Sequence, residues 1–126
     1  MNMRSPLSRA RGHGSSKDGV EHWWAQRLTA VALIPLSFWF VYSMVTMVGS
    51  DFVAYHAWVG AYGNSILLIL FAMTLFHHTQ LGVQVIIEDY VQNGVYKVGG
   101  IILTKLIAVF GGASCVVAIL RISFGS

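Results

Sequence analysis

The stretch that decides the fold runs from Ser65 to Tyr90 and reads SILLILFAMTLFHHTQLGVQVIIEDY. It is apolar over enough residues to cross a membrane as one helix, for which about 20 suffice. His77 and His78 lie near its middle. An ionisable side chain at that depth is costly, and it usually faces a protein interior, a cofactor or a water path. The stretch therefore predicts a membrane helix that also carries function.

The spacing between His78 and Asp89 places both residues on one face of such a helix, provided that the helix persists that far. Eleven steps of about 100° return to within about 20° of the starting direction. A rise of about 1.5 Å per residue separates the two by roughly 16 Å, or about half a bilayer core. A ligand at mid-membrane above a polar, aromatic helix end suits redox chemistry.

The composition indicates that most of the chain lies in lipid. Of 126 residues, 56% are hydrophobic and only 10% are charged, whereas soluble domains average about 25% charged. Helices satisfy their own backbone hydrogen bonds in lipid. The sequence therefore predicts an all-α membrane protein whose domain, residues 20–126, has three transmembrane helices, near Leu28–Val48, Ser65–Ile87 and Val98–Leu120.

Two of the apolar runs contain a residue that is unusual in a membrane helix. Pro35 in the first run predicts a mild kink, which neighbouring helices can absorb. Lys105 lies about two turns inside the third run, from where its ammonium group can reach the nearer interface.

The basic residues predict the orientation, because cytoplasmic loops are rich in Lys and Arg. The loop at 49–64 has neither Lys nor Arg, and Arg121 at the end of the third run is the single basic residue that opposes this orientation. Residues 1–19 are expected to form a mobile basic cytoplasmic tail. We expect the chain to lie in a bacterial inner membrane with its N-terminus in the cytoplasm. The alternative location is the mitochondrial inner membrane. The residues that decide this are Arg4, Arg9, Arg11, Lys17 and Arg27 in or after the tail, and Lys97 and Lys105 after the second run.

Two function classes are disfavoured by the remaining composition. The basic residues are not interleaved with aromatic residues on a polar face, so the net charge of +3 does not indicate nucleic-acid binding. Cys115 is the single cysteine, which excludes an intrachain disulfide, and its apolar surroundings favour a small buried hydrophobe.

The adjacent histidines point about 100° apart on a helix, so one site cannot easily use both. His77 shares a stripe with Gln80, Gln84 and Glu88, which is typical of a hydrogen-bonded contact between helices. His78 shares its face with Gly82, which leaves room for a large flat ligand or for close helix packing.

The surroundings of His78 suit an axial haem ligand, and a histidine bonded to a neighbouring helix is the alternative. The other two runs contain no histidine. A second axial histidine would therefore come from a partner chain.

Three further residues are candidates for ligand contacts. The Tyr90 hydroxyl can donate to a quinone carbonyl, and Asp89 can tune that bond or relay a proton. Arg27 can bind an anion such as a haem propionate. The alternatives are an interfacial aromatic residue for Tyr90, a helix-end charge for Asp89 and a positive-inside anchor for Arg27.

Two motifs together resemble a known family. A histidine is followed by glycine four residues later and by Asp-Tyr at eleven and twelve, here His78, Gly82, Asp89 and Tyr90. The segment HWWAQRLTA spans His22–Ala30. Set on three apolar runs, these motifs are similar to those of the small hydrophobic anchor subunits of succinate dehydrogenase, respiratory complex II.

The resemblance implies a function and a set of partners. Members of the family anchor a flavoprotein and an iron–sulfur subunit to the membrane beside a second three-span anchor. A b-type haem lies between the two anchors with one histidine from each, and ubiquinone is the substrate. FAD and iron–sulfur clusters belong to the partners, so the chain would be a subunit of the enzyme that does not bind succinate.

The resemblance also assigns roles to residues of this chain. By position, the haem ligand would be His78, the residue near the haem propionates Arg27, and the quinone residues Tyr90 and Asp89. The neighbouring His77 leaves the choice of ligand open to challenge.

Three alternatives remain at this stage. A fumarate reductase anchor has the same layout. A proton-relay or transporter subunit would use the face of His78 and Asp89 without haem. A purely structural anchor would hold no cofactor.

Overall fold

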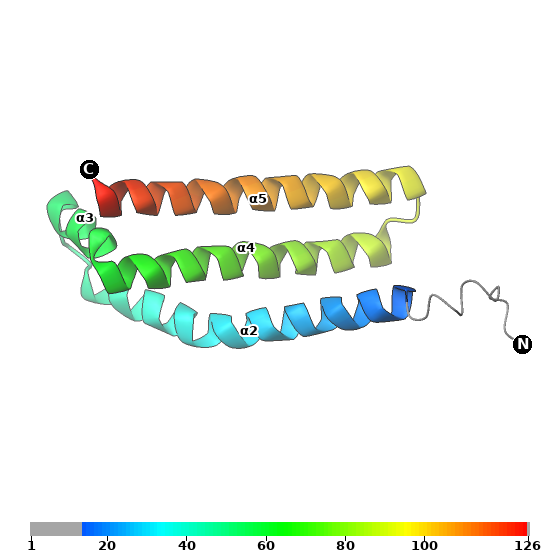
Figure 1. The fold of residues 1–126 in the computed structure, drawn as a ribbon, viewed down its shortest axis with the longest axis horizontal. Helices are drawn as coiled ribbons and strands as arrows, with labels where there is room; N and C mark the ends of the chain where they lie inside the picture. The colour runs from blue at the N-terminus through cyan, green and yellow to red at the C-terminus, as the bar shows by residue number, and fades with distance from the viewer. Residues whose placement is uncertain (1–13, 126) are drawn as a thin grey trace, which may run out of the picture.

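Four α-helices account for most of residues 14–125, the part of the chain that the computed structural model describes (Figure 1). No strand occurs within these residues. Three helices are long and apolar enough to cross a membrane, over Gly19–Thr46, Tyr62–Tyr90 and Gly94–Phe124. The predicted all-α membrane fold with three membrane-length helices is therefore confirmed. The helices are α2 (Gly14–Thr46), α3 (Phe52–Gly60), α4 (Tyr62–Tyr90) and α5 (Gly94–Phe124).

The three long helices begin before the apolar runs that predicted them, and α4 and α5 also end later, whereas α2 ends at Thr46 rather than at the predicted Val48. The first begins at Gly14 rather than near Leu28, because hydropathy marks the part of a helix that lipid surrounds and not the helix end. Residues 1–13 of the expected basic tail lie outside the described residues, and its last six residues, 14–19, form the start of α2. Pro35 lies within α2, which curves along its length in Figure 1.

The central helix of the bundle is α4. It packs against α2 on one side and α5 on the other, whereas the backbones of α2 and α5 do not approach each other closely. Figure 1 shows the N-terminal end of α2 beside the α4–α5 connection, with α3 and the C-terminus at the opposite end. This arrangement places the N-terminal end of α2 and the start of α5, which carries Lys97, at the same end of the bundle.

The short helix α3 was not predicted, because nine residues without a membrane-length run give little signal. Asp51 caps it by accepting a hydrogen bond from the Ala54 amide at 2.9 Å. The Trp58 ring stacks on Trp39 of α2 with centroids 5.6 Å apart. The stacked tryptophans therefore fix α3 against the end of α2.

Close packing between α4 and α5 depends on small residues. A β-carbon at Gly111 would lie 2.5 Å from Cε1 of Phe76, so any larger residue there would force the ring to move. Gly100 is a second close point, where a β-carbon would lie 3.4 Å from Ile87. Small residues let membrane helices approach closely.

Most apolar side chains of the described residues face outward. Only Leu68, Ala72 and Leu81 are buried apolar residues, and all three are on α4. Phe38 on α2 and Phe110 on α5 are 74% and 77% exposed. A surface of this kind is stable where lipid or another apolar chain covers it.

Candidate functional site

His78 is held by a side chain of the neighbouring helix. Its Nδ1 lies 2.9 Å from the Thr29 hydroxyl of α2. The same hydroxyl also contacts the carbonyl oxygens of Ala25 at 2.7 Å and Gln26 at 3.0 Å. The His78 ring is half-buried, and no described residue forms a hydrogen bond with its Nε2. One ring nitrogen is therefore occupied and the other remains available.

The His78 ring lines an open groove of about 440 Å³ between α2 and α4. Apart from His78 and Ser37, the lining side chains are apolar. The lining residues other than His78 all come from a single face of α2 and are Ala30, Leu33, Ile34, Ser37, Phe38 and Val41. The groove thus has an imidazole ring at the edge of an apolar surface, which is an arrangement that suits a flat, largely apolar ligand.

Arg27 lies on the stripe of α2 that lines this groove. It precedes Ile34 by seven residues and Phe38 by eleven, and both spacings return to nearly the same direction on a helix. Its guanidinium carbon is 4.9 Å from the centroid of the Trp23 ring. The charge is exposed and stands about 10 Å nearer the N-terminal end of α2 than Ile34 does. An anionic group on a ligand in the groove would find a cation at that end.

Gly82 faces α2, one turn from His78. The amide nitrogen of Gln26 lies 3.8 Å from the position that a β-carbon of Gly82 would take. Of the two roles expected for Gly82, this contact favours close helix packing over open space for a ligand. The Gln26 Oε1 is buried without a hydrogen-bond partner among the described residues.

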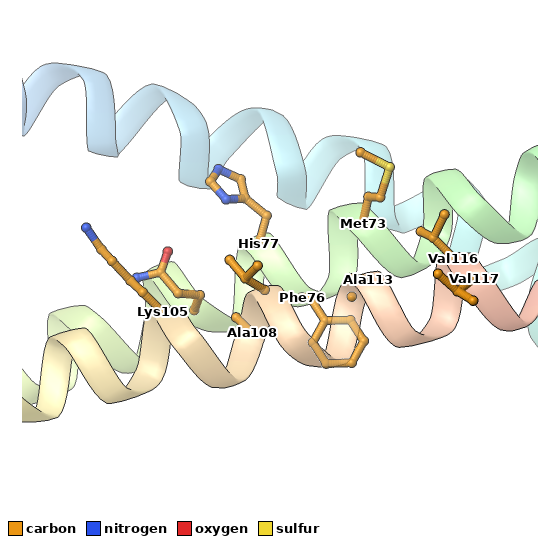
Figure 2. Close-up of a pocket in the computed structure, with 11 residues that line it drawn as sticks. Met73, Phe76, His77, Lys105, Ala108, Ala113, Val116 and Val117 are labelled. Carbon is orange, nitrogen blue, oxygen red and sulfur yellow. The ribbon is translucent and has the colours of Figure 1, made fainter.

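His77 lines a different groove, between α4 and α5, with a volume of about 600 Å³. Figure 2 shows it with Phe76 of the same helix and with Lys105 and Ala108 of α5. Lys105 is exposed in this groove. The expectation that one site cannot use both histidines agrees with this arrangement.

The stripe that begins at His77 does not form the expected bond between helices. The Gln80 amide nitrogen donates to Gln84 Oε1 at 2.8 Å, and both side chains are buried. Because the two residues are four apart on α4, one amide satisfies the other within the helix. This interpretation of the stripe was wrong for the two glutamines.

Asp89 and Tyr90 form the last residues of α4. The helix is unbroken from His78 to Asp89, so the shared face that the spacing predicted is present. Both side chains are exposed, and Tyr90 is 79% exposed. The described residues thus place a phenol and a carboxylate together but do not enclose them, and a closed site there requires another chain.

The sequence analysis assigned no contact to Thr29, which entered only as part of a motif. The signal that was available is its position two residues after Arg27 on a membrane helix, where a hydroxyl bonds its own backbone or a neighbouring helix. The described residues contain no group of three or more His, Cys, Asp or Glu side chains that could hold a metal ion alone.

Most of the chain matches one known protein family. Residues 1–120 match the family described as succinate dehydrogenase/fumarate reductase transmembrane subunit. The chain belongs to this family. The resemblance inferred from the motifs of α2 and α4 is thereby confirmed.

Curated relatives agree with this membership. The succinate dehydrogenase hydrophobic membrane anchor subunit of Rickettsia bellii is 33% identical over 92% of this chain and 93% of its own length. The anchor subunit of the same name from Paracoccus denitrificans is 29% identical over 97% of this chain and 94% of its own length. The succinate dehydrogenase membrane anchor subunit of Reclinomonas americana is 31% identical over 75% and 81%. No solved structure matches the chain significantly.

Proposed function

We propose that this chain is a membrane anchor of a succinate:quinone oxidoreductase. In this role it supplies one axial ligand to a b-type haem and part of the ubiquinone site, and it passes electrons from an iron–sulfur subunit to quinone. Support comes from the family membership and from relatives that are named as anchor subunits of succinate dehydrogenase. The chain carries no nucleotide motif and a single cysteine, so FAD and iron–sulfur clusters belong to its partners.

The observation that carries the haem proposal is the state of the His78 ring. Axial ligation needs a neutral imidazole with a lone pair on one nitrogen and open space beside it. His78 has Nδ1 engaged by Thr29 and its ring beside an apolar groove. The residues present therefore fit a haem held through Nε2, and Arg27 would hold its propionates at the end of the same stripe. When bound, the haem supplies a one-electron carrier.

The open side of the groove supports a second anchor chain as partner. A haem with two histidine ligands needs one from outside this chain, because His77, the other histidine of α4, lines a different groove. The apolar face of α2 around Phe38 is exposed. We propose that the second anchor covers this face and brings the other histidine, while the flavoprotein and the iron–sulfur subunit dock at the basic end of the bundle.

The quinone site is proposed at the end of α4. The exposed Tyr90 hydroxyl would donate to a carbonyl oxygen of the quinone, and the adjacent Asp89 would relay a proton or tune that bond. A partner must enclose these two side chains, since they are exposed in this chain. The orientation proposed is that of a bacterial inner membrane with the N-terminus in the cytoplasm, which the basic residues at this end of the bundle support.

Fumarate reductase remains a second candidate, because the family description includes both enzymes. The two share an anchor layout and differ in the direction of turnover.

The test is to purify the complex through a tag on this chain. The proposal requires that a flavoprotein, an iron–sulfur protein and a second membrane chain co-purify, and that the preparation shows a b-type haem spectrum. Succinate should reduce ubiquinone in the same preparation. A chain that purifies without these subunits, or a complete complex that holds no haem, would contradict the corresponding part of the proposal.

A further inference from the structure

The Thr29 hydroxyl has three polar neighbours and only one hydrogen to share among them. Its oxygen lies 2.7 Å from the Ala25 carbonyl oxygen, 3.0 Å from that of Gln26 and 2.9 Å from His78 Nδ1. The two carbonyl oxygens can only accept, whereas a ring nitrogen of a neutral histidine either donates or accepts. The direction of each hydrogen bond therefore follows from where the hydroxyl hydrogen goes.

One assignment satisfies the short contacts. If the hydroxyl donates to the Ala25 carbonyl, its oxygen is free to accept from a hydrogen on His78 Nδ1. In the opposite arrangement the hydroxyl donates to Nδ1. The carbonyl oxygens of Ala25 and Gln26 would then lie 2.7 Å and 3.0 Å from Thr29 Oγ1 with no hydrogen between the oxygen atoms. Such close oxygen–oxygen contacts without a hydrogen are unfavourable. The geometry thus favours a chain of bonds from His78 Nδ1–H to Thr29 and from Thr29 to the backbone of α2.

We infer that Thr29 is a positioning residue that fixes His78 as the Nδ1–H tautomer and leaves the lone pair on Nε2 for the ligand in the groove. This inference rests on the proposed haem role of His78. The position of Thr29 is itself fixed, because its hydroxyl is bonded to the carbonyl four residues earlier. The backbone of α2 therefore sets both the direction and the tautomer of a ring carried by α4.

The chain of bonds also has an electronic consequence. A ligating histidine whose other N–H donates a hydrogen bond is a more basic ligand. A more basic axial ligand favours the oxidised iron, so the bond to Thr29 lowers the haem midpoint potential. Loss of the hydroxyl should raise this potential and weaken haem retention, for which outer partners of metal-binding histidines typically contribute about 10- to 100-fold.

The experiment compares Thr29→Val with Thr29→Ser in the purified complex, with Thr104→Val as the matched control. Thr104 also bonds the carbonyl four residues earlier, at 2.8 Å, but it is on α5 and has no side-chain partner in the described residues. We expect Thr29→Val to raise the haem midpoint potential and to lose haem at least about tenfold more readily than the wild type. Thr29→Ser and Thr104→Val should keep the wild-type potential.

A second measurement keeps the inference testable if Thr29→Val does not assemble. Nitrogen-15 NMR of histidine-labelled full-length chain in detergent, without haem, reports which ring nitrogen of His78 carries the hydrogen. We expect the hydrogen on Nδ1. A hydrogen on Nε2 in the wild type would overturn the inference.

Failure of the inference and failure of the haem proposal give different results. If His78→Leu removes the haem signature but Thr29→Val matches Thr104→Val in potential and retention, Thr29 has no positioning role while His78 remains the ligand. If His78→Leu keeps an unchanged haem spectrum, the haem proposal itself is wrong, and the role of Thr29 falls with it.

Discussion

The ring of Phe76 on α4 occupies the space that a side chain at Gly111 on α5 would need. A β-carbon at residue 111 would lie 2.5 Å from Cε1 and 2.9 Å from Cζ of the ring. This contact lies between α4 and α5, away from the residues of α2 and the His78 ring that line the His78 groove, so the first prediction is independent of any ligand there.

Gly111→Ala should destabilise the packing of α5 on α4 by about 1–3 kcal/mol, because the ring must move away from an overpacked position. Thermal unfolding in detergent would measure the change. Gly99→Ala is the matched control on the same helix, since nothing lies within 4 Å of a β-carbon there. Combining Gly111→Ala with Phe76→Leu should recover part of the loss. Equal stability of the Gly111→Ala and Gly99→Ala proteins would show that the ring moves without cost.

His78→Leu should abolish or strongly alter the haem spectrum of the purified complex, whereas His77→Leu should leave it unchanged. The reason is that His78 lines the groove beside α2 and His77 lines the groove beside α5. The two substitutions are chemically identical and differ by one position, so each controls for the other. Loss of the spectrum in the His77 variant with retention in the His78 variant would reverse the assignment.

Tyr90→Phe should slow ubiquinone reduction roughly threefold to tenfold, which corresponds to the loss of one hydrogen bond of about 0.5–1.5 kcal/mol. Succinate oxidation by a soluble dye should be unaffected, because the dye takes electrons before they reach the membrane. Tyr62→Phe is the control, since Tyr62 is a similarly exposed tyrosine at the other end of α4. Unchanged quinone reduction in the Tyr90 variant would make this residue an interfacial aromatic, and equal loss in both assays would indicate damaged assembly.

Membrane-impermeant thiol labelling of whole cells should modify a cysteine at Ser50 but not one at Gln92. Both positions are exposed and lie in connections at opposite ends of the bundle, and the excess of basic residues places the Gln92 end in the cytoplasm. Gln92 is preferable to Asn93 because the Asn93 side chain caps α5 through the amides of Val95 and Tyr96. Labelling at Gln92 from outside the cell would reverse the proposed orientation.

The membrane helices were predictable because three apolar runs of membrane length leave few other folds. The start of α2 at Gly14 and the helix α3 were not, since neither has a hydropathy signal. Within α4, periodicity correctly placed His78 and Asp89 on one face because only the helical repeat was needed. It could not identify the bond between Gln80 and Gln84, because a side chain's partner depends on its rotamer as well as on its face.

The contact between Thr29 and His78 was beyond prediction for a related reason. It depends on the register of α2 against α4, and a single sequence contains no information on that register. The occupancy of the space beside Gly82 was unpredictable for the same reason, because the side chain that lies there, Gln26, comes from the other helix. The sequence therefore pointed to His78 as the candidate haem ligand but not to Thr29 as its hydrogen-bond partner.

Backbone contacts join α2 to α4 and α5 to α4 but do not join α2 to α5, so the region around Thr29 and the region around Gly111 belong to different helix pairs. Substitutions that share no partner and lie far apart usually have additive effects on stability. The effects of a substitution at Gly111 and of one at Thr29 on stability should accordingly add when the two are combined. The α2 residues and the His78 ring that line the groove include no residue of α5, so sequence changes in α5 that suit its lipid or subunit neighbours should leave the surroundings of the histidine largely unchanged.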